Sequence, residues 1–221
     1  MPTIHLINQP IQLDSRLKTW LLIIIATAFL TLIMTAPGIK QALLIAGVIA
    51  CGCGFSYFLL LKGTVEYTLT ATHFQQHLFK GGWVVKWSNI SHIGICQYSY
   101  QGWQTPLPWV GIKLKNYSPY LDSICPRIAT EILLDQRPLL YLGLRQTKRN
   151  AEFEDMVLDT NQFRTEDGRV YKGLQAMLAN RMRYQRENYD YDVFISASDL
   201  ERPIEDFVGL ARRYLAAAKP E

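Results

Sequence analysis

The sequence predicts two transmembrane helices at the amino end, followed by an α+β domain built on an antiparallel sheet. No charged residue occurs from Thr19 to Ile39, and after Lys40 none follows until Lys62. Beyond Lys62, apolar and polar residues alternate in successive short runs, the period expected of half-buried strands. The predicted divisions are a cytoplasmic tail at 1–18, the membrane helices within 19–62 and a cytoplasmic domain at 63–221.

The two apolar runs, at about 19–37 and 41–61, are each close to the length of a membrane span. A helix needs roughly 20 apolar residues to cross about 30 Å of hydrocarbon. The runs lack the polar stripe of helices in a soluble bundle, which is the alternative interpretation. A cleavable signal peptide is the alternative for the first run alone, but Pro37 would follow the cut and a second apolar run comes directly after. Pro37-Gly38 therefore predicts a tight turn between two helices.

The flanking charges predict the orientation of this hairpin. Arg16 and Lys18 precede the first helix and Lys62 follows the second, whereas the turn carries only Lys40. The positive-inside rule then favours both chain ends in the cytoplasm.

Small and hydroxyl residues recur every four positions in both apolar runs, which predicts close helix packing in the membrane. The intervening Cys51 and Cys53 point about 200° apart on a helix, so they cannot share a metal or form a disulfide there. The predicted packing residues are Ala42, Ala46, Ala50 and Gly54 in the second helix and Thr27, Thr31 and Thr35 in the first.

The domain begins with a series of predicted strands. Gly81-Gly82 supplies residues suited to a hairpin turn, and Ser88-Asn89 indicates another turn. We expect a loop over 101–108, which separates the fourth and fifth strands. Strands are predicted at 65–70, 73–80, 83–87, 90–100 and 109–115.

Helices are expected next. Residues 119–149 carry apolar residues at helical spacing interrupted by prolines, which predicts two or three short helices, and 170–187 reads as an amphipathic helix. A strand at 192–196 then precedes a final helix in which Pro203 suits the first turn. The stretch 118–187 is thus a helical insertion, and the last helix caps the sheet.

The order of these features resembles bacterial pleckstrin-homology-like (PH-like) domains. The shared features are a strand ending Tyr67-Thr-Leu-Thr70, the turn Trp87-Ser-Asn-Ile90, and a closing strand followed by Ile204-Glu-Asp-Phe207. The resemblance implies a partly open barrel capped by the carboxyl-terminal helix.

Three further stretches resemble an uncharacterised gammaproteobacterial family of two-span membrane proteins. They are Gly111-Ile-Lys-Leu-Lys115, Pro126-Arg127-Ile-Ala129 and Asp135-Gln-Arg137. This resemblance implies a multi-pass protein of the bacterial inner membrane.

No catalytic, nucleotide-binding or metal-binding motif occurs in the chain. His73 and His77 have a zinc-like spacing, but on a strand they lie about 13 Å apart and cannot share an ion. We therefore expect no cofactor, no metal site and no catalytic residue.

Two basic clusters are the candidate contacts for anionic lipid headgroups or a partner, since each basic residue held near such a surface contributes about 1 kcal/mol. A solvated helix face is the alternative interpretation. The domain is not strongly basic, so no nucleic-acid partner is expected. The clusters comprise Arg145, Lys148 and Arg149, and Arg181, Arg183 and Arg186.

These observations favour a non-enzymatic membrane protein whose domain binds a protein partner or the membrane surface, with a homo-oligomer through the hairpin as a further expectation. One alternative is a membrane-tethered enzyme of unrecognised class, which a cleft gathering two or more of His92, Asp155, Asp159 and Arg127 would favour. The other is a structural or assembly subunit of a membrane complex.

Overall fold

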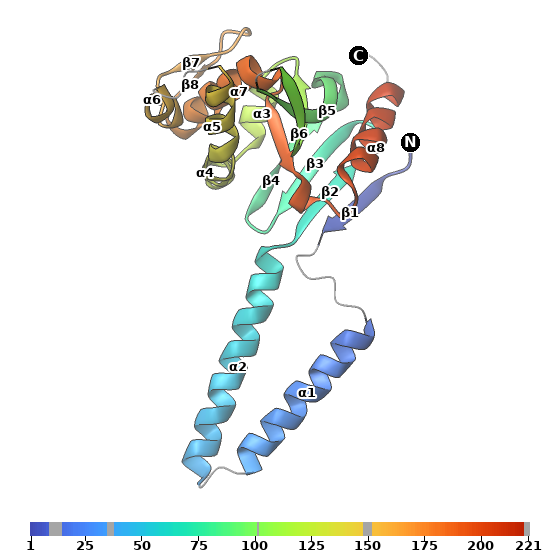
Figure 1. Ribbon diagram of the computed structural model, residues 1–221, viewed down its shortest axis with the longest axis vertical. Helices are drawn as coiled ribbons and strands as arrows, with labels where there is room; N and C mark the ends of the chain where they lie inside the picture. The colour runs from blue at the N-terminus through green and yellow to red at the C-terminus, as the bar shows by residue number, and fades with distance from the viewer. Residues whose placement is uncertain (9–14, 35–37, 101, 148–151, 219–221) are drawn as a thin grey trace. The chain divides into compact units, whose positions relative to one another are not determined.

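The computed structural model describes residues 1–8, 15–34, 38–100, 102–147 and 152–218. These residues form two compact units (Figure 1). Met1–Asn8 and Val65–Glu221 form the first unit, and Gln9–Thr64 the second.

The first sheet of the larger unit contains four antiparallel strands that neighbour one another in sequence order. Three of them were expected, because Val65, Tyr67 and Leu69 point into the core while the polar residues between them face outward or pair across the sheet. His73 and His77 lie on a strand as predicted. The strands are β1 (Ile4–Asn8), β2 (Val65–Leu69), β3 (His73–Leu78) and β4 (Gly81–Lys86).

Strand β1 corrects the expectation that residues 1–18 are only a tail. It pairs antiparallel with β2, with Asn8 opposite Val65, and its Leu6 side chain is 2% exposed in the core. The Asn8 side-chain amide also donates to the Ser198 carbonyl at 2.6 Å. Five residues are too short a pattern to identify without the partner strand, so β1 could not be predicted from its own residues.

The β3–β4 hairpin turns at Phe79-Lys80, so the prediction that Gly81-Gly82 forms the turn itself is wrong by two residues. Both glycines belong to β4, where Gly81 has φ +137°. A Cβ atom on Gly82 would lie 1.9 Å from the Gln76 carbonyl oxygen. Gly82 is needed because two backbones approach closely, and Gly81 because of its positive φ, so neither glycine serves to reverse the chain.

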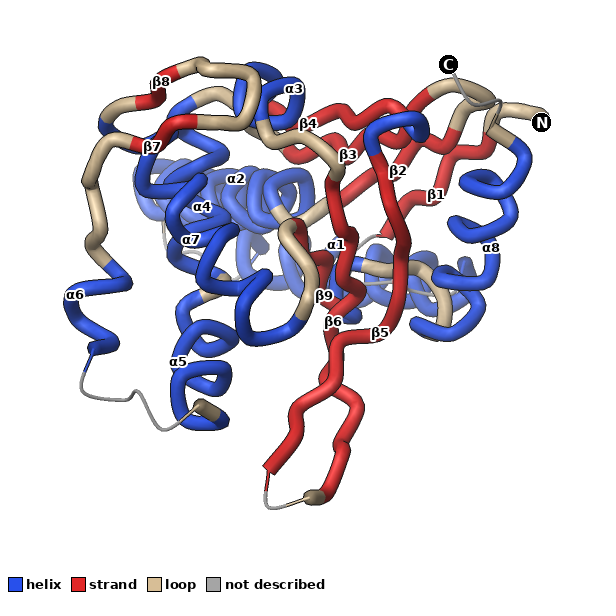
Figure 2. Tube along the Cα trace, turned by 90° about the horizontal axis from the view of Figure 1, so that it is seen from above, coloured by secondary structure: helices blue, strands red, loops and turns tan. Residues whose placement is uncertain are grey.

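The second sheet contains β5 (Ile90–Tyr100), β6 (Trp103–Leu114) and β9 (Val193–Ser196), all antiparallel. The 3₁₀ turn η1 (Trp87–Asn89) leads into it, at the predicted turn. The expected loop at 101–108 is wrong, because β6 already begins at Trp103. Strands β5 and β6 extend together as a hairpin beyond the rest of the sheet (Figure 2).

The insertion between β6 and β9 is mainly helical, as predicted. Pro126 and Pro138 lie in the first turns of two of its helices, where a missing N–H is tolerated. The short α6 and the two-residue strands β7 and β8 were not predicted. Its elements are α3 (Ser118–Ser123), α4 (Pro126–Asp135), α5 (Arg137–Gln146), α6 (Phe153–Val157), β7 (Phe163–Arg164), β8 (Val170–Tyr171) and α7 (Gly173–Tyr189).

The predicted carboxyl-terminal helix is α8 (Ile204–Ala217), which follows the short turn η3 (Ala197–Asp199). Figures 1 and 2 show α8 on one side of the second sheet and α5 and α7 on the other. The Phe207 ring of α8 lies 5.6 Å from the Tyr67 ring and 6.1 Å from the Phe74 ring of the first sheet. Helix α8 therefore joins the two sheets in one aromatic core.

The fully buried carboxylate of Asp192 ties the insertion to the second sheet. It accepts hydrogen bonds from the Leu114 amide at 2.7 Å and the Tyr117 hydroxyl at 2.6 Å. Arg186 of α7 forms an ion pair with it, donating from Nε at 2.6 Å and also from Nη2. Three segments thus meet on one side chain.

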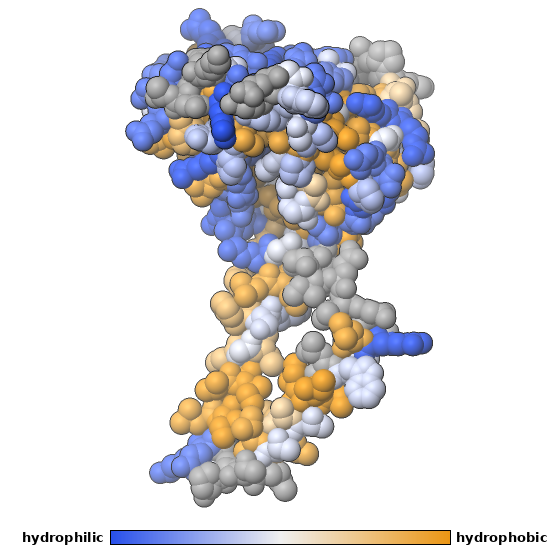
Figure 3. Space-filling model, viewed as in Figure 1, coloured by the Kyte–Doolittle hydropathy of each residue, from blue (hydrophilic) through white to orange (hydrophobic). Residues whose placement is uncertain are grey.

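The second unit holds helices α1 (Ser15–Met34) and α2 (Ile39–Lys62), whose side chains form a largely apolar surface (Figure 3). By length and composition α2 can cross a membrane, whereas the described part of α1 contains a shorter apolar stretch, Leu22–Leu32. The two predicted spans therefore remain a prediction, and the predicted turn residue Pro37 lies outside the described residues.

Candidate functional site

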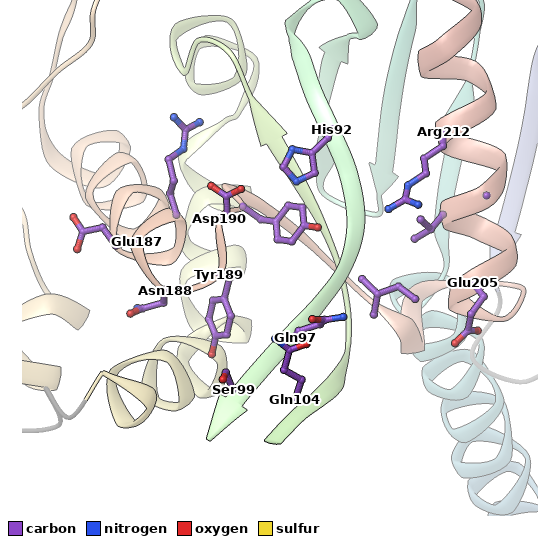
Figure 4. Close-up of a pocket in the computed structure, with 15 residues that line it drawn as sticks. His92, Gln97, Ser99, Gln104, Glu187, Asn188, Tyr189, Asp190, Glu205 and Arg212 are labelled. Atoms are coloured by element: carbon purple, nitrogen blue, oxygen red, sulfur yellow. The ribbon is translucent and has the colours of Figure 1, made fainter. Parts of the chain in front are cut away.

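The domain contains a polar cleft of about 830 Å³. In Figure 4 the end of α7 and the residues after it form one wall, β5 and β6 the floor, and Glu205 and Arg212 of α8 the other wall. We call it the polar cleft; it is lined by His92, Ile95, Gln97, Ser99, Gln104, Arg186–Tyr191, Glu205, Val208, Gly209 and Arg212.

The floor of the polar cleft is shaped by two paired glycines. Gly94 of β5 lies opposite Gly111 of β6, and the Tyr191 ring covers both. A Cβ atom on either glycine would lie 2.2 Å from an atom of Tyr191. Arg212 reaches the same place and donates from Nε to the Ile93 carbonyl at 2.7 Å. Glycine within a strand often marks such a close approach, so the sequence contained a signal that we did not use.

The charges in the polar cleft are mixed in sign. Lys113 forms an ion pair with Asp190 at 2.5 Å, and this hydrogen bond holds the pKa of Asp190 below its usual range. The His92 ring lies 5.0 Å from the Tyr191 ring, and burial raises the pKa of that tyrosine. Among the described residues, no side chain is in hydrogen-bonding distance of His92, so no base with an oriented partner is formed here. The cleft can recognise a polar ligand but lacks an assembled catalytic pair.

A second, smaller cavity of about 190 Å³ lies between the end of β6, β7 and α7. Four cationic side chains line it, together with the single carboxylate of Glu166. We call it the basic cavity; it is lined by Lys115, Asn116, Tyr117, Phe163, Arg164, Thr165, Glu166, Arg183 and Arg186.

The basic cavity contains two of the six predicted headgroup contacts, Arg183 and Arg186. Arg181, from the same predicted cluster, is 1% exposed and cannot touch a membrane surface or a partner. Its guanidinium donates to the carbonyls of Leu133 at 3.5 Å and Val157 at 3.0 Å, near the carboxyl ends of α4 and α6. We therefore correct this assignment: Arg181 is a core residue that satisfies helix-terminal carbonyls.

The other predicted cluster is described only at Arg145, an exposed residue of α5; Lys148 and Arg149 lie outside the described residues. The remaining cations of the basic cavity, Lys115 and Arg164, were not predicted. They belong to other elements than α7, and only the fold brings them beside Arg183.

A family described as protein of unknown function (DUF2982) matches residues 67–217. The chain belongs to this family. The DUF2982 region runs from Tyr67 of β2 to Ala217 at the end of α8, so it includes both cavities and excludes α1, α2 and β1. No curated protein and no solved structure matches the chain.

Of the four side chains named for an enzyme, the described part of this DUF2982 protein brings two together, Asp155 and Asp159. His92 lines the polar cleft, and Arg127 lines a shallow hollow beside α4. Asp155 and Asp159 do share a third hollow, of about 520 Å³. Asp159, however, accepts hydrogen bonds from the Tyr184 hydroxyl at 2.6 Å and the Asn161 amide at 3.0 Å. Its carboxylate therefore holds the insertion together.

Within the residues described, no group of three metal-binding side chains lies together in the DUF2982 protein. The expectation that it carries no cofactor stays a prediction.

The predicted packing residues of the helices are partly described. Thr27 and Thr31 donate hydrogen bonds to carbonyls of their own helix. Ala50 and Gly54 of α2 are exposed, and an added Cβ on Gly54 would meet nothing within 4 Å. Ala46 is half-buried, whereas Thr35 and the side chain of Ala42 lie outside the described residues.

Proposed function

We propose that this protein is an integral protein of the bacterial inner membrane, in which α1 and α2 form a two-span anchor and the domain is a PH-like, non-enzymatic interaction module in the cytoplasm. The observation that carries the anchor is the β1–β2 pairing, because these strands flank the two helices in the chain.

The pairing supports an even number of membrane crossings. Asn8 and Val65 are partners in one sheet, so the two ends of segment 9–64 must lie on the same side of any membrane. Helix α2 has 24 residues and measures about 36 Å, enough to cross about 30 Å of hydrocarbon. If α2 crosses, the chain must cross back before it, and α1, with 20 residues and about 30 Å, is the helix available.

The same pairing argues against removal of the first helix as a signal peptide. Cleavage after α1 would take away β1, and with it the buried Leu6 and the hydrogen bond from the Tyr214 hydroxyl to the Pro2 carbonyl at 2.5 Å. The basic residues Arg16 and Lys62, at the outer ends of the helices, favour the cytoplasm for this side.

A PH-like barrel is supported by the two antiparallel sheets and by the way α8 packs against both. An interaction role is supported by the protruding β5–β6 hairpin, at whose tip Trp103 is 80% exposed. An indole in water is a typical anchor for a partner surface or a membrane interface, because it pairs a large apolar ring with one N–H donor. We place the membrane surface first, since tethering raises the effective concentration of headgroups.

The anchor is tested by carbonate extraction and by reporter fusions at both chain ends. We expect the protein to stay in the membrane and both ends to report the cytoplasm. Val48→Arg, near the middle of α2, should weaken insertion by about 2.5–3.5 kcal/mol. The control is Val170→Arg, an exposed apolar residue of the domain; Val170 is 46% exposed and Val48 is 64% exposed. Extraction of the native protein by carbonate, or ends on opposite sides, would refute the anchor.

The exposed small residues of α2 support a homo-oligomer through the anchor. Ala50 and Gly54 leave room for close approach of a second helix. Ala50→Leu with Gly54→Leu should reduce crosslinked dimers in native membranes, and Leu43→Ala with Leu44→Ala is the control. Equal crosslinking in all variants would contradict this part of the proposal.

A further inference from the structure

The basic cavity gathers four cations beside three carboxylates: Glu166 lines the cavity, Asp192 pairs with Arg186, and Asp159 pairs with Arg183. Lys115 and Arg164 form no ion pair with any described residue. Arg183 is 49% exposed and forms only a long ion pair with Asp159, at 4.0 Å, which is beyond hydrogen-bonding distance. Arg183 and Arg186 are three residues apart on α7, so they lie on the same helix face. The cavity is therefore an electropositive pocket.

One of these cations is held rigidly in place. Arg186 uses Nε and one terminal nitrogen, Nη2, to bind Asp192 and the Leu114 carbonyl. Its other terminal nitrogen, Nη1, makes no hydrogen bond within the described part of the chain. A guanidinium fixed by one carboxylate loses little side-chain freedom when its remaining donors bind an anion, which favours affinity.

The floor of the basic cavity is aromatic. The Tyr117 and Phe163 rings stack with centroids 5.8 Å apart. Arg186 lies over Tyr117 at 4.9 Å and Arg183 over Phe163 at 6.0 Å. The rings orient the guanidinium planes and exclude water below them, and a lower local dielectric strengthens attraction to an anion.

The size and charge of the cavity restrict the ligand. Its volume of about 190 Å³ is below the roughly 300–1,000 Å³ of pockets that enclose drug-sized molecules. A carboxylate carries one negative charge, whereas a phosphate monoester carries about 1.5–2 and three acceptor oxygens. Several cations with several free N–H donors match the phosphoryl group better.

We propose that the basic cavity is a binding site for the phosphoryl group of a small phosphate ester. Arg164, Arg183 and Lys115 are its principal contacts, and Arg186 is a cation already held in place. The phosphoryl group could come from a soluble phosphate ester or from an anionic lipid headgroup. The second source rests on the proposed membrane anchor, but binding of a soluble ester does not.

The test is calorimetric titration of the full chain in uncharged detergent with inorganic phosphate and with glycerol 3-phosphate, using acetate as the control anion. We expect saturable binding of both phosphates and none of acetate. Arg164→Gln with Arg183→Gln should weaken binding about tenfold or more, since each removes charged hydrogen bonds. The control pair, Arg127→Gln with Arg213→Gln, removes equal charge from exposed sites elsewhere and should leave it unchanged.

The source is separated by repeating the titration in nanodiscs of phosphatidylcholine and of phosphatidylcholine mixed with phosphatidic acid, a lipid that carries a phosphate monoester. If headgroups fill the site, glycerol 3-phosphate should bind about tenfold more weakly in the nanodiscs with phosphatidic acid, and only in the chain with Arg164 and Arg183 intact. Equal affinity in both lipids identifies a soluble ester. No saturable phosphate binding in detergent, or equal loss in both variant pairs, would overturn the site. Equal urea midpoints for all variants verify that folding is unchanged.

Discussion

The buried carboxylate of Asp192 gives the sharpest stability prediction. Its side chain is 0% exposed and receives hydrogen bonds from Leu114, Tyr117 and Arg186. Replacing it by alanine would leave a buried amide and a buried hydroxyl without acceptors and would separate α7 from the second sheet.

The expected loss follows from these contacts. Removing one member of a buried ion pair costs about 3–5 kcal/mol. Arg186 stays 32% exposed and can be hydrated in the variant, so its stranded charge adds less than a fully buried one would. We therefore expect about 3–4 kcal/mol for Asp192→Ala. Asp192→Asn keeps one acceptor oxygen but places an amide N–H₂ against a donor, so about 2–3 kcal/mol is expected.

The assay is urea unfolding of the full chain in detergent, followed by fluorescence of the buried Trp83 and Trp87. The control is Asp190→Asn, two residues away, where the carboxylate is 63% exposed and pairs with Lys113. A surface ion pair of this kind contributes about 0–1 kcal/mol. Equal losses at Asp190 and Asp192, or a loss below about 1 kcal/mol at Asp192, would refute the argument that this side chain joins insertion to sheet.

Three further predictions concern the domain. Burial raises the pKa of the Cys96 thiol to about 12, whereas Cys125 is exposed. In a variant without Cys51 and Cys53, a thiol reagent at pH 8 should therefore modify Cys125 quickly and Cys96 only on unfolding. Fast modification of both thiols would contradict the burial of Cys96. Burial also raises the pKa of Asp199, so the native state binds this proton more tightly than the unfolded state and the free energy of unfolding should fall as pH rises through the acid range. Asp199→Asn should flatten this part of a plot of urea midpoint against pH. An unchanged slope would contradict the role of Asp199. Gly111→Ala should lower the free energy of unfolding by about 1–3 kcal/mol, because its methyl group overpacks against Tyr191. In a Tyr191→Ala background most of this loss should disappear. Additive losses in the double variant would disprove the contact.

The regular elements with strong local patterns were predictable. Strands β2 and β3 alternate clearly, and α8 combines a proline at its N-cap, directly before the first helical residue, with a continuous apolar face. Strand β1 was not, because its five residues gain their structure from pairing with β2, which lies more than fifty residues away in the sequence. The start of β6 was missed for a related reason: Pro106 and Pro108 indicate a loop, but the outer part of a protruding hairpin tolerates missing donors.

The candidate site was predictable only in part. The run of arginines on α7 was visible, yet helical geometry sends Arg181 into the core and leaves Arg183 and Arg186 on the face that meets β7. Their spacing alone could not tell which face would be covered.

Local periodicity and hydropathy were enough to predict the apolar character of residues 19–62, most of the strands and helices that follow, and the helical insertion. The fold was needed to show that the amino-terminal residues return to the same sheet as β2, that Asp192 holds Arg186 in place, and that Lys115 and Arg164 join Arg183 around one cavity. These features depend on contacts between residues distant in sequence, which local pattern does not encode.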